Sequence, residues 1–183
     1  ITTNDTRSTG DALMARLNYT LLSRYLLTAS VRRDGYSAFG QENPRATFPA
    51  FALAWVVSDE SFFNVSSIDR MKLRVSWGAN GNRDIGIYSA LANTGSSLWY
   101  NGTSTRVGVY NSTLANSGLR WERTTSLNFG LDVTLLKGRI DLSADYYDMT
   151  TTDLLMERVL PRVTGFNSIM SNLGELGNKG FEM

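Results

Sequence analysis

Apolar and polar residues alternate with a period of two along much of the chain, most clearly between Ser126 and Tyr147. Every second residue is apolar up to Leu135 and again from Ile140, while the residues between them are polar. This period is typical of β-strands that have one apolar and one polar face. The pattern is interrupted at Lys137-Gly138, where glycine tolerates a left-handed backbone. The sequence therefore predicts two antiparallel strands joined by a two-residue turn.

A two-residue turn fixes which residues face each other across this hairpin. It pairs Leu136 with Arg139, and every apolar residue then lies beside an apolar one: Leu135 with Ile140, Val133 with Leu142, Leu131 with Ala144, and Phe129 with Tyr146. Polar residues meet on the other face: Thr134 with Asp141, and Asp132 with Ser143. A slip of one residue would destroy this agreement on both faces, so we expect this register.

Four earlier segments follow the same alternation, at residues 13–20, 24–32, 48–57 and 71–78. Leu26 is an exception on the polar side of the second segment. The third segment is weaker, because alanines occupy positions that should be polar: Ala50, Ala52 and Ala54. Together with the hairpin, these segments predict six whole strands and the start of a seventh near the end of the chain. A helical turn is predicted at residues 59–63. The expected fold class is all-β and antiparallel.

Short and long connections alternate between the predicted strands. The short ones lie at residues 21–23 and 137–138, an intermediate one at 58–69, and the long ones at 34–45, 80–118 and 156–179. Loops longer than about 12–15 residues are uncommon in compact domains. Outer-membrane barrels, in contrast, have short periplasmic turns and long extracellular loops. The alternation predicts a wall of a transmembrane β-barrel, with Lys137-Gly138 in the periplasm and the long loops outside.

Aromatic side chains on the apolar face lie near predicted strand ends: Tyr19, Tyr25, Trp55, Trp77, Phe129 and Tyr146. Membrane barrels carry aromatic girdles at these positions. A soluble β-sandwich also has apolar, aromatic inner faces and is the alternative fold. The opposite face carries charged residues, which favours the barrel: Arg16, Arg74, Asp132, Asp141 and Asp145.

Composition excludes several classes of function. The 183 residues contain 18 Lys+Arg and 17 Asp+Glu, a net charge of +1, and this balance argues against nucleic-acid binding. The chain has no cysteine and no histidine, so thiolate or imidazole metal sites and histidine-based catalysis are not expected. We therefore expect no enzyme activity, no cofactor and no metal. No segment has the run of about 20 apolar residues that a transmembrane helix needs, and no signal peptide is recognised.

Few residues remain as candidates for binding. Asp141 and Asp145 lie four residues apart on one strand, about 13 Å, which is too far for a pair of glycosidase carboxylates; we expect them to line the barrel interior. Gly174, Gly177 and Gly180 form a GxxGxxG motif. It neither follows a buried apolar strand nor opens a helix, so a dinucleotide-binding site is not expected there. Trp99 and Tyr100 lie in the longest loop and are candidates for contact with a sugar substrate or a capping partner, packing within the loop being the alternative. Trp121 is predicted to be a girdle or structural residue.

Several short motifs occur in one order from about Asp11 onward: Arg33-Asp34-Gly35, Phe48-Pro49-Ala50-Phe51, Lys72-Leu73-Arg74-Val75-Ser76-Trp77-Gly78, Asn80-Gly81-Asn82, Leu119-Arg120-Trp121-Glu122, Asn128-Phe129-Gly130-Leu131-Asp132, Asp145-Tyr146-Tyr147 and Asn178-Lys179-Gly180-Phe181-Glu182. This series resembles the SusC/RagA family of TonB-dependent outer-membrane transporters, in the C-terminal half of the barrel. Trp77 and Tyr36 depart from the residues more usual in that family.

The resemblance implies a plugged barrel of roughly 22 strands in the bacterial outer membrane. It also implies import of oligosaccharides or peptides, a SusD-like surface lipoprotein as partner, and energy supplied by the TonB complex. Residues 1–183 would be part of the barrel domain, cut at both ends, with the plug and TonB-contact segments outside the chain. The alternatives are a TonB-dependent receptor for a siderophore or vitamin and a soluble carbohydrate-binding or adhesin module.

Overall fold

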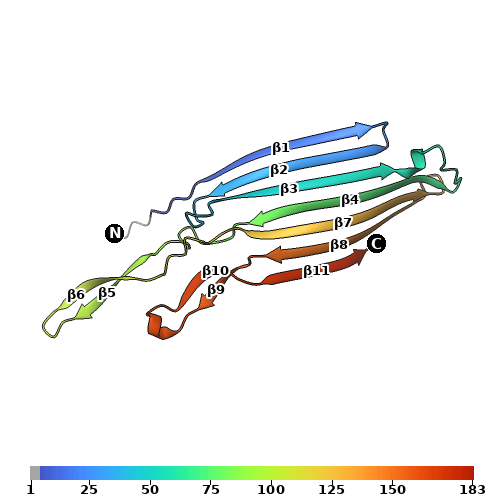
Figure 1. Cartoon of the computed structure of the whole chain (residues 1–183). Coiled ribbons are helices and arrows are strands. Elements are labelled where there is room, and N and C mark those ends of the chain that lie inside the picture. The colour runs from blue at the N-terminus through green and yellow to red at the C-terminus, as the bar shows by residue number, and fades with distance from the viewer. Residues whose placement is uncertain (1–4) are drawn as a thin grey trace.

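The computed structural model describes residues 5–183, and its main element is one antiparallel sheet of seven strands (Figure 1). In spatial order these strands are β1 (Gly10–Leu21), β2 (Tyr25–Tyr36), β3 (Arg45–Val56), β4 (Ile68–Asn82), β7 (Glu122–Leu135), β8 (Ile140–Thr152) and β11 (Glu175–Glu182). Each strand pairs antiparallel with its neighbour, and the sheet is open at β1 and β11. The expected all-β, antiparallel barrel wall is confirmed.

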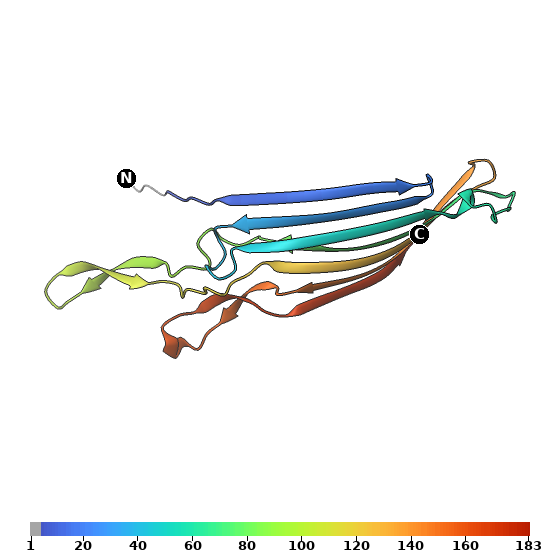
Figure 2. The same cartoon turned by 45° about the horizontal axis from the view of Figure 1, so that its top comes forward.

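Two short hairpins extend beyond one end of this sheet, as both views show (Figures 1 and 2). One pairs β5 (Thr94–Tyr100) with β6 (Thr105–Asn111), and the other pairs β9 (Leu155–Val159) with β10 (Ser168–Asn172). We call this end of the sheet the loop end. The opposite end, with the connections at 22–24, 57–67 and 136–139, is the turn end. The predicted six whole strands and the start of a seventh correspond to the seven strands of the main sheet, with β11 beginning at Glu175. The two hairpins in the long connections after β4 and β8 were not predicted.

Helical structure is confined to two short 3-10 turns within residues 5–183, η1 (Val57–Asp59) and η2 (Arg162–Thr164). The first begins two residues before the predicted helical turn at 59–63, and a separate turn follows in which the amide of Phe63 donates to the carbonyl of Glu60 at 3.0 Å. Among residues 5–183, no helix has both the length and the apolar character needed to cross a membrane.

The register of the β7–β8 hairpin is confirmed, but its turn differs from the prediction. Leu135 faces Ile140 and Phe129 faces Tyr146, as do all the predicted pairs between them. The connection, however, is a four-residue turn in which Leu136, Lys137 and Gly138 have φ values of 55°, 59° and 74°. The turn is bound to the start of β4 and to the residue before it, because Leu136 N donates to Ser67 O at 3.2 Å and Gly138 N to Asp69 Oδ2 at 3.0 Å. These bonds replace the predicted pair between Leu136 and Arg139.

One face of the seven-stranded sheet is apolar and exposed. Register places its side chains in rows across the strands; one row contains Leu17, Ala29, Phe51, Trp77 and Leu127. On β7 the apolar positions run from Leu127 to Leu135, about 26 Å at about 3.3 Å per residue. The apolar band of outer-membrane barrels is about 25 Å tall. No second sheet packs on this face among residues 5–183, so the β-sandwich alternative is wrong.

The buried core lies at the loop end rather than between layers of secondary structure. It contains Phe39, Phe48, Ala79, Ala90, Leu119 and Trp121. Trp121 stacks on Phe39 with ring centroids 4.8 Å apart and meets the edge of Phe48 at 5.7 Å. Its side chain is buried one residue before β7 begins. Trp121 is therefore structural, and its alternative role in an aromatic girdle is wrong. This core fixes the loops that follow β2 and β4 against the end of the sheet.

Candidate functional site

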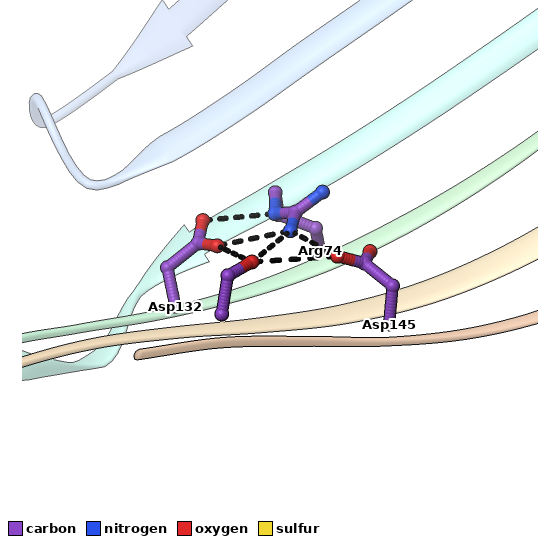
Figure 3. Close-up of polar contacts among 4 residues, drawn as sticks. Arg74, Asp132 and Asp145 are labelled. Atoms are coloured by element: carbon purple, nitrogen blue, oxygen red, sulfur yellow. Dashed lines mark hydrogen bonds and ion pairs between the residues drawn. The ribbon is translucent and has the colours of Figure 1, made fainter. Parts of the chain in front are cut away.

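The polar face carries an ion-pair network centred on Arg74 of β4 (Figure 3). Its guanidinium donates to Asp132 of β7 through two bonds of 2.8 and 2.9 Å, and to Asp145 of β8 at 3.1 Å. Ser143 adds a hydroxyl that donates to Asp132 at 3.0 Å. The two carboxylates and the arginine are each only partly exposed. One cation thus holds three neighbouring strands together on the polar face.

Gly130 makes this geometry possible. It lies on β7 directly between Arg74 and Asp145 in the register. A Cβ at this position would lie 2.6 Å from Arg74 Cζ and 2.6 Å from Asp145 Oδ1. The guanidinium therefore lies flat across the backbone of β7, where any side chain would displace it. A glycine inside a strand often marks such a close approach.

The acidic residues predicted on the polar face are confirmed there, and each has its own partner. Asp141 accepts a hydrogen bond from Thr134 at 2.7 Å, whereas Asp145 belongs to the Arg74 network. Neither carboxylate is paired with the other. This arrangement supports a polar, hydrogen-bonded lining and provides no pair of groups for acid–base chemistry.

The turn end holds a second cluster, centred on Glu60. Its carboxylate accepts hydrogen bonds from the Tyr25 hydroxyl, from Trp55 Nε1 at 3.1 Å and from Arg24 at 2.6 Å. The Tyr25 hydroxyl is the largest influence that lowers the pKa of Glu60, followed by the Trp55 indole. Sequence analysis did not find this cluster, although the Ser58-Asp59-Glu60 turn and the predicted girdle residues Tyr25 and Trp55 were its signals. It ties the 57–67 connection to β2 and β3.

The β5–β6 hairpin carries Trp99 and Tyr100, the predicted contact residues, on opposite faces. Trp99 covers Gly108, where a Cβ would lie 2.3 Å from its ring. Tyr100 is 71% exposed and its hydroxyl donates to Gly102 O at 2.7 Å. The Tyr100 face is largely apolar and exposed, and also contains Leu98, Val107 and Val109. We call these four residues the Tyr100 patch. Trp99 is itself 62% exposed, so both aromatic side chains are accessible on the surface of the hairpin.

An exposed apolar band on one face, a charged lining on the other and long hairpins at one end characterise a wall segment of a transmembrane β-barrel. The family model described as "TonB dependent receptor-like, beta-barrel" matches residues 1–183. The chain therefore belongs to the TonB-dependent receptor β-barrel family, whose members are outer-membrane barrel proteins that act as receptors and transporters rather than enzymes.

Curated relatives and solved structures agree with this assignment. The chain is 39% identical over 173 residues to TonB-dependent receptor P39 of Formosa agariphila, covering 94% of this chain and 16% of the relative. It is 39% identical over 183 residues to TonB-dependent receptor SusC of Bacteroides thetaiotaomicron, covering 97% of this chain and 18% of that relative. The structure of the RagAB peptide transporter superposes with a TM-score of 0.86 at 28% identity, covering 95% of this chain and 19% of that one. The chain thus spans less than a fifth of these proteins.

Proposed function

We propose that this chain is part of the barrel wall of an outer-membrane importer of oligosaccharides or peptides. The observation that carries the proposal is that, in register across seven strands, one face of the sheet is apolar and the other is mainly polar or lined by small residues. The similarity to SusC and to the RagAB peptide transporter supports import rather than enzymatic action. It also favours this substrate class over the siderophore or vitamin alternative.

In this proposal the apolar face contacts outer-membrane lipid and the polar face lines the lumen. The turn end lies in the periplasm and the loop end outside the cell, as in other outer-membrane barrels. Residues 1–183 form part of the barrel domain, and a plug and the remaining strands belong to the rest of the protein. TonB supplies the energy through segments outside this chain.

A SusD-like surface lipoprotein is the proposed partner at the loop end. The Tyr100 patch supports such a contact, because it places four exposed apolar side chains on a hairpin that projects beyond the sheet (Figure 1). Tyr100 and, beside it, Trp99 are the residues of this chain that we propose for contact with the lid or with a bound substrate.

Growth of the host bacterium tests the proposed function. Deleting the full-length gene should abolish growth on at least one oligosaccharide or peptide source, and the intact gene should restore it. Growth on free monosaccharides and amino acids should not change. A deletion strain that fails only under iron or vitamin limitation would contradict the proposal and favour the alternative receptor class.

Co-purification tests the lid contact. In the full-length transporter, Tyr100→Ala should reduce recovery of the lipoprotein severalfold. The control is Arg139→Ala, which changes an exposed residue of the turn end, far from the proposed lid contact. Equal recovery with both variants would contradict a role of the Tyr100 patch.

A further inference from the structure

The polar face has a second charged region nearer the loop end, and it differs from the Arg74 network. A pocket of about 550 Å³ lies there over β1 to β4, within the size range of small-molecule sites. Three arginines and one aspartate line it: Arg16, Arg32, Arg83 and Asp34. We call it the arginine pocket. Its lining also includes Ser30 and Asn80.

Only one of the three arginines has a carboxylate partner. Arg32 binds Asp34 through two bonds of 2.9 and 2.7 Å, and the Asp34 carboxylate is nearly buried. Among residues 5–183, no carboxylate lies within ion-pair distance of Arg16 or Arg83. The pocket therefore has an excess of positive charge that the chain itself does not neutralise.

Arg83 is nevertheless held in place. The guanidinium carbon of Arg83 lies 4.8 Å from the centre of the Tyr36 ring, a cation–π contact. Arg83 also reaches the start of β1, where its NH1 lies 3.3 Å from the position of a Cβ on Gly10. Arg16 borders a floor of small residues, because its row across the sheet continues through Ser30, Ala50 and Gly78. These small side chains leave the pocket open.

We propose that the arginine pocket binds an anionic group, a carboxylate or a sulfate ester, on an oligosaccharide that enters the barrel. Arginine binds both groups through paired N–H donors, and the side chains of Ser30 and Asn80 suit sugar hydroxyls. A peptide cannot bind here by adding a strand to the floor, because the strands beneath already hydrogen-bond to one another. The inference rests on the proposed function and narrows its substrate class to acidic oligosaccharides.

Binding to the purified full-length transporter in detergent tests this inference without requiring uptake. Isothermal titration would compare tetragalacturonate, a sulfated tetrasaccharide from carrageenan, maltotetraose and a glutamate-rich tetrapeptide. At least one acidic sugar should bind about tenfold more tightly than maltotetraose, and the advantage should shrink as salt is raised. Comparing the two acidic sugars distinguishes carboxylate from sulfate.

Substitutions locate the site. Arg16→Gln and Arg83→Gln should each weaken binding of the acidic sugar by about tenfold, the effect of one charge-assisted hydrogen bond. Arg33→Gln is the matched control, because Arg33 lies on the apolar face of β2 beside Arg32 and should leave affinity within about twofold.

Three results would overturn the inference: no preference for an acidic sugar, tightest binding of the peptide, or equal losses in Arg16→Gln and Arg33→Gln. Because binding is measured on purified protein, these results are distinct from a failure of the growth test of import.

Discussion

Two regions of the polar face use the same residue types in opposite ways. Around Arg74 one cation meets two carboxylates and a hydroxyl, so every charge has a partner. In the arginine pocket, about 13 Å farther along the sheet, three cations meet one carboxylate. A closed network of this kind holds strands together, whereas unpaired cations around an open volume are available to a ligand. The partner count, more than the residue type, separates a structural site from a binding site.

The largest effect on stability is expected from Arg74→Met. It removes the only ion-pair partner of Asp132 and Asp145 among residues 5–183 and leaves Lys72, opposite Asp132 in the register, as the nearest remaining cation. Because these groups are partly exposed, solvent screening limits the loss to about 2 kcal/mol of unfolding free energy. Urea unfolding of the full-length transporter in lipid vesicles measures it. Arg70→Met, on the same strand but outside any ion pair, should cost less than about 0.5 kcal/mol. Equal losses of unfolding free energy in Arg74→Met and Arg70→Met would contradict a structural role of the Arg74 network.

Gly130→Ala tests whether the closed network depends on backbone shape. The added methyl group would push the guanidinium away from β7, with an expected loss of about 1–2 kcal/mol. Gly177→Ala is the control, since no atom lies within 4 Å of a Cβ there. The same unfolding assay compares them. If Gly130→Ala is as stable as the control, Arg74 does not need the flat approach seen here.

The Glu60 cluster at the turn end should make the stability of the fold depend on pH. Its pKa is lowered below the ordinary 4.5 in the folded protein, so the hydrogen-bonded cluster stabilises the fold above pH 4.5 and loses this contribution as pH falls through the lowered pKa. The thermal midpoint of the native protein should therefore exceed that of Glu60→Gln at pH 7, and the difference should shrink below about pH 4.5. A constant difference across this range would contradict the assigned cause.

The smallest effect is expected from Arg16→Met. Arg16 has the same residue type and faces the same side as Arg74, but it has no carboxylate partner within residues 5–183. Its loss should change the unfolding free energy by less than about 0.5 kcal/mol, measured beside Arg74→Met. A loss comparable to that of Arg74→Met would show that Arg16 is structural and would weaken the case for the arginine pocket.

Prediction from sequence succeeded where the physics is local. Period-two alternation and a short turn were enough for the β7–β8 register, since a shift of one residue would reverse both faces. It failed in the long connections. Residues 94–111 contain many Gly, Ser and Thr, and only pairing between the two halves of the segment makes the β5–β6 hairpin recognisable. The aromatic residues there cover glycines, which the sequence pattern does not indicate.

The sequence by itself determined the strands of the main sheet and their two faces, because these depend on the alternation of neighbouring residues, and its ordered motifs indicated the family. Only the tertiary structure decided which charges are paired. Arg74 and Asp132 are 58 residues apart in the sequence. The sequence around a charged residue on one strand does not indicate which residue of another strand is its partner. Trp121 was ambiguous for the same reason, since its burial depends on Phe39 and Phe48 from another loop and strand. The contrast between a closed network and an open arginine pocket exists only when the strands lie side by side.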